Sequence, residues 1–287
     1  MRYCLVVFRS PFGHFVGKVS NQDLKLIINF WREKMNLISK ALLPLLLTLS
    51  FNISADDHIP QAPYLFPLET MQCNFNENKD MNDLMKLQGE WKKFIEGNDE
   101  ISYAAWVITP LYRSASDFTN DIAWLGASPS WTAFGKGYQA WFEEAGRLAE
   151  KFNDVYTCDT RQMFATQSIR QSENTSDNGV MLVSNCSLIN DATLMDVAAA
   201  DQKWNAYLDS QNSDGSILRW YPGPGTPTDL DYSFKYVQTA PSMSAWGESS
   251  ESFVNGGGLM KQAEIFGNIV SCDSARFYSI NAYGGQQ

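Results

Sequence analysis

Apolar and polar positions follow the same succession of patterns in two halves of the chain. In each half an apolar strand precedes an amphipathic helix, two aromatic strands, a longer helical stretch and a closing strand. The closing segments, VYTCDTRQMFA at 155–165 and IVSCDSARFYSI at 269–280, share a Cys-Asp pair and a following Arg. The pattern predicts the order β-α-β-β-α-β twice, over residues 66–170 and 179–287, joined by a linker at 171–178.

The helices of each half are recognisable from their caps and apolar stripes. Asp80 and Thr193 stand at the N-cap positions of the first helix of each half. Apolar residues then follow at helical spacing: Leu84, Leu87, Trp91 and Phe94, and in the other half Leu194, Val197, Trp204 and Leu208. The second helical stretches, 130–152 and 242–266, contain glycines that cost about 1 kcal/mol each within a helix, so we expect breaks there.

The middle segments predict strands over 103–112 and 121–129 in one half and over 217–225 and 234–241 in the other. A β-α-β-β-α-β unit folds into a four-stranded antiparallel sheet with both helices on one face. Each sheet then has a bare face, and two such sheets in one chain can cover each other. We therefore predict an α+β fold of two tandem ferredoxin-like repeats, packed sheet to sheet as a closed or nearly closed barrel.

Four cysteines lie within the two repeats, one pair in each. Cys73 and Cys158 are 85 residues apart, and Cys186 and Cys272 are 86 apart. In the expected sheet the end of the first strand lies beside the start of the last, so we predict a disulfide within each pair. Zinc is the competing interpretation, but no two cysteines form a C-x-x-C motif, and we predict no metal site. Disulfides are typical of oxidising compartments.

Segment 35–55 has the anatomy of a secretory signal peptide. Met35 and one Lys precede a thirteen-residue apolar stretch, Ala41–Ile53, and two small residues follow. The stretch is short of the roughly 20 residues that span a bilayer, although an uncleaved membrane anchor is the rival interpretation. We predict a secreted or periplasmic protein with a linker at 56–65. We expect translation to start at Met35; otherwise residues 1–34 form a long region preceding the signal.

Composition places the bulk of the chain among globular proteins with many aromatic rings. The 287 residues are 44% hydrophobic and 13% aromatic, with 9 Trp, and the formal net charge is −10. Cleavage after residue 55 would remove more basic than acidic residues and leave a charge near −15. Such a charge repels phosphates and anionic lipid headgroups, so we expect no nucleic acid partner and no membrane partner after signal cleavage.

The doubled β-α-β-β-α-β order over about residues 66–280 resembles the dimeric α+β barrel superfamily. This superfamily includes antibiotic-biosynthesis-monooxygenase-like proteins, and here the dimer would be fused into one chain. The resemblance implies a sheet-lined cleft that holds a small organic molecule or haem, and many members are oxygenases or isomerases. Haem-binding members commonly supply a His ligand, whereas His58 is the one His after residue 55 and lies outside both repeats. We therefore assign no cofactor.

Aromatic and arginine side chains on the predicted strands are the candidate ligand-binding residues: Trp106, Trp124, Arg161, Arg219, Trp220, Tyr236 and Arg276. The rings would either fill the barrel or hold an aromatic ligand, and small barrels are normally filled by side chains. A buried Arg could clamp a ligand carboxylate, whereas an Arg at the surface pairs with a neighbouring Asp. Both alternatives stay open at this point.

Catalytic groups cannot be identified from the sequence. No Ser-His-Asp set can be assembled, and paired cysteines are not nucleophiles. Asp159 and Asp273 follow the paired cysteines in both repeats, which indicates a structural role in binding turn amides or a nearby Arg. We predict an exported monomer with pseudo-two-fold symmetry that binds a small apolar or aromatic molecule in an aromatic-lined cleft. The alternative is a cofactor-independent monooxygenase or isomerase.

Overall fold

The structure is a computed structural model, and it describes residues 4–10, 13–19, 63–114, 118–174, 176 and 178–285. The chain divides into two compact units, Met1–Gln61 and Ala62–Gln287. The expected signal peptide at 35–55 lies outside the described residues, as does most of the linker at 56–65. No helix in the described part of the chain is long and apolar enough to cross a membrane.

The first unit contains a hairpin of two antiparallel strands, β1 (Cys4–Ser10) and β2 (Gly13–Val19). Cys4 pairs with Val19 at one end of the hairpin, and Ser10 pairs with Gly13 at the other. The sequence did not predict this hairpin. The rest of the fold concerns the second unit, which holds every residue of the candidate site.

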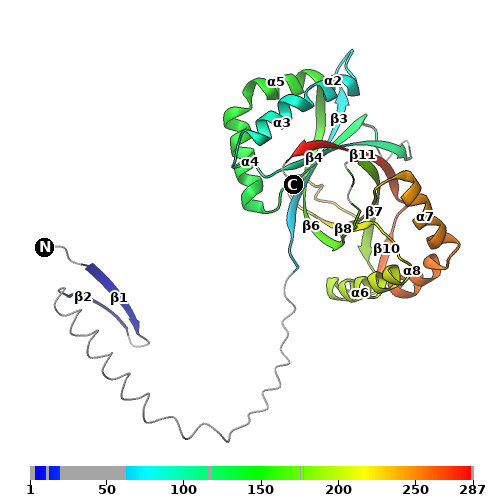
Figure 1. Cartoon of the computed structure of the whole chain (residues 1–287). Coiled ribbons are helices and arrows are strands. Elements are labelled where there is room, and N and C mark those ends of the chain that lie inside the picture. The colour runs from blue at the N-terminus through cyan, green and yellow to red at the C-terminus, as the bar shows by residue number, and fades with distance from the viewer. Residues whose placement is uncertain are drawn as a thin grey trace, which may run out of the picture. The chain divides into compact units, whose positions relative to one another are not determined.

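The second unit follows the expected order of strands and helices, except that the closing strand predicted over 269–280 is divided into two strands (Figure 1). Its first half consists of β3 (Phe66–Phe75), α2 (Met81–Lys86), α3 (Gln88–Glu96), β4 (Ala104–Tyr112), β5 (Ile122–Ala127), α4 (Trp131–Glu144), α5 (Gly146–Val155) and β6 (Tyr156–Arg170). Its second half consists of β7 (Asn178–Leu188), α6 (Leu194–Ser210), β8 (Ser216–Pro222), β9 (Phe234–Ala240), α7 (Met243–Val254), α8 (Gly258–Phe266), β10 (Val270–Cys272) and β11 (Arg276–Gly285).

The helices begin and break where the sequence indicates. Asp80 and Thr193 each form a capping box. The side chain of the cap residue accepts a hydrogen bond from the backbone N–H of the third helical residue, and the carboxylate of that third residue accepts one from the backbone N–H of the cap residue. The glycine-containing stretches are each divided into two helices, α4 with α5 and α7 with α8. Gly257 separates α7 from α8 with a φ of 89°, a conformation that glycine adopts without strain.

Eight strands of the second unit close into an antiparallel barrel. The pairing order is β10-β7-β11-β4-β5-β3-β6-β8-β9, and β9 pairs again with β7, which closes the ring. The first half contributes β6-β3-β5-β4 and the second half β11-β7-β9-β8, and the two halves meet at the β4–β11 and β6–β8 pairs. The two sheets therefore do more than face each other, because hydrogen bonds also join their edge strands. Closure satisfies backbone groups that open edges would leave exposed.

One apolar cluster occupies the interior of the barrel. It takes a buried residue from each strand of the ring: Leu68, Ile108, Leu125, Phe164, Met181, Trp220, Val237 and Tyr278. Side chains alternate between the two faces of a strand, so residues from all of these strands can meet only on the barrel axis. The barrel interior, which the sequence analysis considered as a possible ligand cleft, is therefore packed with side chains.

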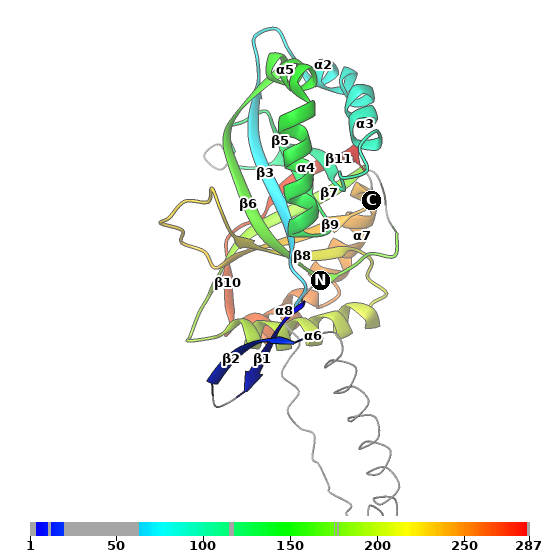
Figure 2. The same cartoon turned by 90° about the vertical axis from the view of Figure 1, so that its left-hand side faces the viewer.

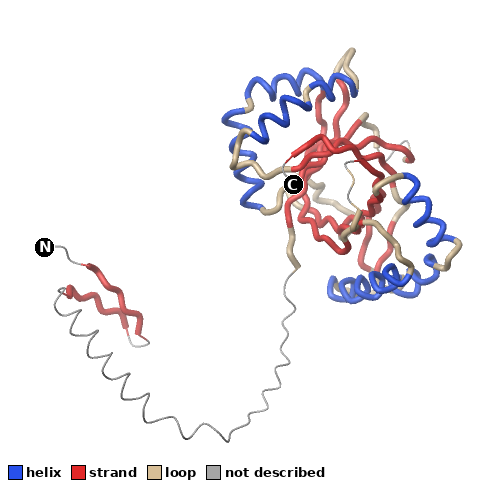
Figure 3. The backbone as a smooth tube through the Cα atoms, in the orientation of Figure 1, coloured by secondary structure: helices blue, strands red, loops and turns tan. Residues whose placement is uncertain are grey.

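Helices cover the outer face of the barrel in two separate layers. Figures 1 and 3 show α2, α3, α4 and α5 against one side of the strands and α6, α7 and α8 against the other. Figure 2, turned by 90°, shows α4 lying along β3 and β6. Each layer is built from one half of the chain, which is the arrangement expected when both helices of a unit lie on one face of its sheet.

Both predicted disulfides form. Cys73 is bonded to Cys158 and joins β3 to β6, and Cys186 is bonded to Cys272 and joins β7 to β10. In each case the two cysteines are register partners of adjacent antiparallel strands. These bonds favour an oxidising, non-cytoplasmic compartment.

Candidate ligand-binding cavity

The two helical layers differ in how completely they are packed. In the first layer Trp91 contacts Tyr103, Trp124, Trp141 and Phe152 with ring centroids 5.9, 5.5, 5.6 and 6.0 Å apart, mostly edge to face. In the second layer the helices leave a cavity of about 600 Å³ against the sheet. This volume is within the range of small-molecule sites.

The cavity lies between the outer face of the second half-barrel and its three helices. Strands β7, β8 and β9 supply one wall, which includes Leu182, Ser184, Ile217, Arg219, Tyr236 and Gln238. Helices α6, α7 and α8 supply the other, which includes Val197, Trp204, Trp246, Ser250, Phe253 and Phe266. Most of the lining is apolar and aromatic, with a few polar groups between the rings.

Smaller side chains at corresponding positions account for part of this space. Met71 and Ser184 each stand two residues before the disulfide cysteine of their opening strand. Tyr138 and Ser250 follow the N-cap serines of α4 and α7 by the same number of residues. The first layer therefore has a methionine and a tyrosine where the second has two serines, and both serines line the cavity.

A third difference lies at the start of the second strand of each half. Tyr103 lies across Gly126, where an added Cβ would come within 1.6 Å of the Tyr103 hydroxyl. In the second half, the pairing of β8 with β9 places Gly215 where the first half has Tyr103, and Gln238 where it has Gly126. Both line the cavity, so no ring closes this part of the second layer.

A buried ion pair occupies the wall of the cavity. Arg219, on β8, is 2% exposed and donates from both terminal nitrogens to the carboxylate oxygens of Asp201 on α6, each at 2.9 Å. The guanidinium also lies 4.7 Å from the ring centroid of Phe234. Burial raises the pKa of Asp201, while the hydrogen bonds from Arg219 oppose that shift. The same pairing raises the pKa of Arg219 against the effect of its own burial, so the pair is held in its charged form.

Three buried hydrogen-bond donors on the cavity wall have no acceptor among the described residues: the Nε of Arg219, the indole Nε1 of Trp204 and the hydroxyl of Tyr236. Burial, and then the nearby Asp201 carboxylate, raise the pKa of Tyr236, so its hydroxyl keeps its proton. Trp204 and Gln238 lie close to that hydroxyl, but neither makes a hydrogen bond of ordinary geometry with it.

The first layer contains a polar network of a different kind. Glu69, on β3, is 5% exposed and accepts hydrogen bonds from the hydroxyls of Tyr103, at 2.6 Å, and of Tyr138. The Nε1 of Trp124 donates to the Tyr103 hydroxyl at 2.9 Å. Burial raises the pKa of Glu69, and the two phenols together with Arg161 oppose the shift. Each named polar side chain of this network has a partner.

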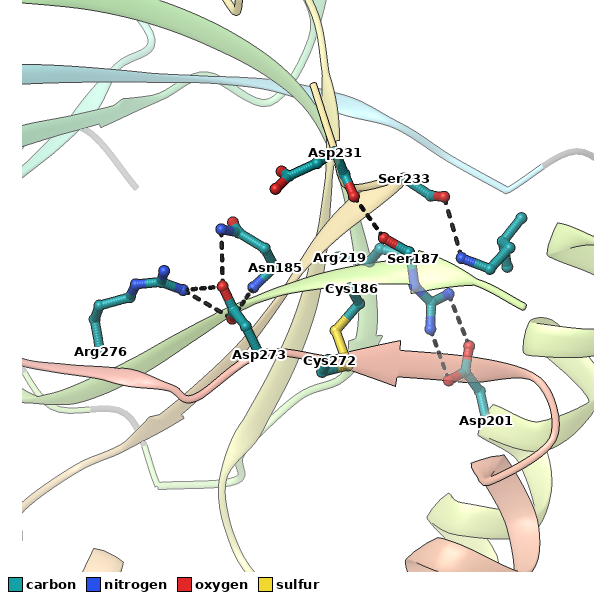
Figure 4. Close-up of a disulfide and its surroundings, with 11 residues drawn as sticks. Asn185, Cys186, Ser187, Asp201, Arg219, Asp231, Ser233, Cys272, Asp273 and Arg276 are labelled. Carbon is teal, nitrogen blue, oxygen red and sulfur yellow. Dashed lines mark hydrogen bonds and ion pairs between the residues drawn. A yellow bond between two sulfur atoms is a disulfide. The ribbon is translucent and has the colours of Figure 1, made fainter. Parts of the chain in front are cut away.

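The disulfide Cys186–Cys272 and Asp273 form one end of the cavity. Asp273 accepts from the backbone nitrogen and Nδ2 of Asn185 at 2.8 and 3.1 Å and pairs with Arg276 at 2.7 Å (Figure 4). Asp201 and Arg219 lie on the other side of the disulfide in the same view. Asp273 thus binds a backbone amide, a side-chain amide and a nearby Arg, as the sequence indicated.

Asp159 makes similar contacts in the first half, where it accepts from Asn74 and Asn120 at 3.0 and 2.9 Å. Lys235 is a half-buried cation beside Asn185, and its Nζ donates to the Asn185 Oδ1 at 2.6 Å. Burial, and then Arg276, lower the pKa of Lys235 to about 8. Lys235 is the register partner of Trp220, so it lies on the inner face of the barrel and not on the cavity wall.

The predicted ligand-binding residues do not share one cleft. Trp106 and Trp220 belong to the packed barrel interior, whereas Trp124 lies in the first helical layer and Tyr236 in the second. The physical reason is that adjacent residues along a strand point to opposite faces, so residues chosen only for lying on central strands divide between the two. A role in ligand binding stays a prediction for each of them.

The three predicted arginines are also separated. Arg161 is exposed on the outer face of the first half, where its register partner is Met71. Arg276 is paired with Asp273. Arg219 alone lines the cavity, together with Tyr236 from the predicted set.

Two residues of the cavity were missed by the sequence interpretation, Asp201 and Trp204. Asp201 interrupts the apolar stripe of α6 between Val197 and Trp204, and a carboxylate at a core position of an amphipathic helix indicates a buried partner. That signal was present in the sequence. Among the described residues, no group of three or more His, Cys, Asp or Glu side chains could hold a metal ion.

Comparison with known proteins finds no matching family model and no similar curated protein. Solved structures with a similar arrangement include an anthrone oxidase-like protein, with 10% identity over 78% of this chain and 95% of that one and a TM-score of 0.45. A chlorite dismutase from Candidatus Nitrospira defluvii has 8% identity, coverages of 77% and 93% and a TM-score of 0.44.

A DyP-type peroxidase from Cellulomonas bogoriensis is similar at 7% identity, with coverages of 79% and 91% and a TM-score of 0.44. At these scores the comparisons carry no argument. The fold is therefore assigned from the strand pairings of this chain, which define an α+β protein with a closed antiparallel barrel.

Proposed function

We propose that this protein binds a small, largely apolar organic molecule in the cavity between the second half-barrel and helices α6, α7 and α8. The observation that carries the proposal is the space of about 600 Å³ in the second layer, which is lined by rings. The first layer has a cavity of about 520 Å³ beside α2 and α3, but polar side chains such as Gln88, Lys92 and Glu96 line it, and its aromatic cluster around Trp91 is packed. Protein interiors are normally close-packed, and an unfilled volume of this size forfeits contacts that a core would otherwise make. A ligand would restore them.

The test uses a neutral fluorescent probe, N-phenyl-1-naphthylamine, which becomes bright in apolar sites. The wild-type protein is expected to bind it saturably. Ser184→Met combined with Ser250→Tyr places the side chains of the first layer into the second, and should abolish binding while the protein stays folded. Ser244→Tyr is the matched control, because Ser244 is exposed on the same helix α7.

Saturable binding that survives the double filling variant would contradict the proposal, as would the lack of any binding by the wild type. Unfolding in urea, followed for each variant, separates loss of the site from loss of the fold.

A second candidate function is a cofactor-independent monooxygenase or isomerase. The observation that favours it is the Tyr236 hydroxyl, a buried polar group without a partner among the described residues, in a cavity large enough for an organic substrate. Oxygen uptake with phenolic and naphtholic compounds, without added metal or flavin, tests it. Tyr236→Phe should lower kcat more than it raises KM if the hydroxyl takes part in the reaction. No uptake and no isomerisation with compounds that bind would exclude this function.

We also infer that the chain arose by tandem duplication of a ferredoxin-like unit and that it is exported as a monomer. The matched disulfides and the similar order of elements support the first inference. The two disulfides and the apolar segment at 41–53 support export. The β4–β11 and β6–β8 pairs that join the two halves lie within one chain, so a second copy is not needed to close the barrel. N-terminal sequencing and light scattering of the exported protein test the last two points.

A further inference from the structure

The unpartnered donors of the cavity wall specify the polar end of the ligand. Arg219 and Tyr236 are register partners on β8 and β9, so their side chains leave the same face of the sheet side by side. Trp204 approaches from α6 on the opposite wall, where it is 2% exposed. Three N–H or O–H groups thus line one cavity, and a buried donor without an acceptor destabilises the folded protein.

The residues nearest to these donors do not provide the missing acceptor. Both carboxylate oxygens of Asp201 already accept from the terminal nitrogens of Arg219. The hydroxyl of Tyr221 lies near the same guanidinium and donates to Gln167 at 3.0 Å. Neither its oxygen nor the Gln238 side chain beside Tyr236 makes a hydrogen bond of ordinary geometry with the three donors. An acceptor supplied by a bound molecule would satisfy the three donors without breaking any of these contacts.

The charge of the wall decides which kind of acceptor fits. Two arginines line the cavity, and each is paired with a carboxylate: Arg219 with Asp201 and Arg170 with Asp209. Asp273 on the same wall is paired with Arg276, and Asp214 adds a further carboxylate. An anionic ligand would therefore be desolvated at a wall whose described arginines already have carboxylate partners, so neither is left to compensate its charge. A neutral acceptor incurs no such cost.

We propose that the ligand is a neutral molecule with an apolar ring body and a carbonyl-type oxygen, which accepts hydrogen bonds from Tyr236, Trp204 and the Nε of Arg219. This inference rests on the proposed binding function and adds the chemical class of the ligand. It distinguishes neutral ketones, quinones and related carbonyl compounds from hydrocarbons and from carboxylic acids.

Three compounds that share one ring body test the class: 9-fluorenone, fluorene and fluorene-9-carboxylate. Each is titrated into the full exported protein by displacement of N-phenyl-1-naphthylamine and by calorimetry. Fluorenone is expected to bind about tenfold or more tightly than fluorene, as two to three modest hydrogen bonds would give, and the carboxylate more weakly than either. Equal affinity of fluorenone and fluorene, or tighter binding of the carboxylate, would overturn the inference while leaving the binding function intact. Failure of both the fluorescent probe and all three compounds would overturn the binding function itself.

Variants assign the contact to residues. Tyr236→Phe removes one hydrogen-bond donor and keeps the ring, so it should lower the affinity for fluorenone by about three- to tenfold and leave the affinity for fluorene unchanged. Trp204→Phe should act in the same direction. Tyr207→Phe is the control, because Tyr207 stacks on Trp204 with ring centroids 5.1 Å apart and does not line the cavity. Equal losses for fluorenone and fluorene in Tyr236→Phe would show a change of shape only and would contradict the proposed hydrogen bond.

Discussion

The two halves of this barrel have a similar order of elements and a disulfide at matching positions, yet aromatic rings are packed around Trp91 in the first helical layer and line a cavity of about 600 Å³ in the second. Rings of Tyr103, Tyr138 and Tyr283 fill the first layer. Tyr283 comes from the end of β11, where it stands at a bulge between Ala282 and Gly284. The difference teaches that the backbone arrangement permits either a core or a site, and that a few side-chain volumes decide which one forms.

The polar networks around Glu69 and Arg219 differ in the same sense, although the Nε1 of Trp91 in the first layer, like that of Trp204 in the second, has no partner among the described residues. The carboxylate of Glu69 accepts from two phenols, and one of these phenols accepts from Trp124, so the network is closed on itself. The pair of Arg219 and Asp201 leaves one donor of the guanidinium without an acceptor among the described residues. A satisfied network stabilises a core, whereas an unsatisfied one is typical of a binding site.

Breaking the buried ion pair should give the largest effect on stability. Arg219→Met leaves Asp201 buried without its partner, and we expect a loss of about 3–5 kcal/mol in the free energy of unfolding. The double variant Arg219→Met with Asp201→Leu should recover most of that loss, because no charge is then left unpaired. Urea unfolding of the oxidised protein measures both. A double variant as unstable as the single one would show that the pair is not the cause.

The two corresponding tryptophans should differ in how much their removal costs. Trp91→Ala leaves a void within a ring cluster and should cost about 3–5 kcal/mol. Trp204→Ala should cost about 1 kcal/mol less, since Trp204 lines the cavity and fewer side chains surround that part of the layer. Denaturant midpoints at constant m-value make the comparison. Equal losses would contradict the claim that the second layer is the less densely packed.

Exchanging Met71 and Ser184 sharpens the comparison further. Met71→Ser removes a buried side chain from the first layer and should cost about 2–4 kcal/mol. Ser184→Met adds volume to the cavity and should raise stability by about 0.5–1.5 kcal/mol while it weakens the binding of the fluorescent probe. Thermal unfolding reports both changes. A destabilising Ser184→Met would indicate that the cavity is too shallow at this wall to accept the longer side chain.

The smallest expected effect is the pH dependence that Glu69 contributes. Burial raises the pKa of Glu69 above its ordinary 4.5, so the folded state binds this proton more tightly than the unfolded state. The stability that results is fully present below the unfolded pKa and is lost as pH rises through the folded value. Glu69→Gln should flatten the dependence of the urea midpoint just above pH 4.5. An unchanged slope would assign the dependence to other carboxyls, of which Asp201 is the first candidate because burial raises its pKa too.

Much of the architecture was predictable because its causes are local. Cap residues, apolar spacing and glycine breaks depend on neighbours in the chain, and they indicated helices such as α2 and α6 with their capping boxes. The disulfide pairs followed from the order of elements, since the opening and closing strands of each half must lie side by side. The amino-acid sequence alone therefore determined most of the order of elements, the cysteine pairs and the packing of two sheets as a closed or nearly closed barrel, whereas the hydrogen-bonded β4–β11 and β6–β8 pairs were seen only in the structure.

The site was decided by contacts between distant residues. Trp106 and Trp124 both lie on aromatic strands in the sequence, yet Trp106 packs into the barrel and Trp124 into a helical layer. The face of the sheet to which a side chain points depends on the register of its strand, which the pattern of residue types did not fix. The cavity exists because Gly215, Ser184 and Ser250, far apart in the chain, converge on one volume. Whether a space is filled depends on the sum of side chains that reach it from all elements, and only the tertiary structure brings those side chains together.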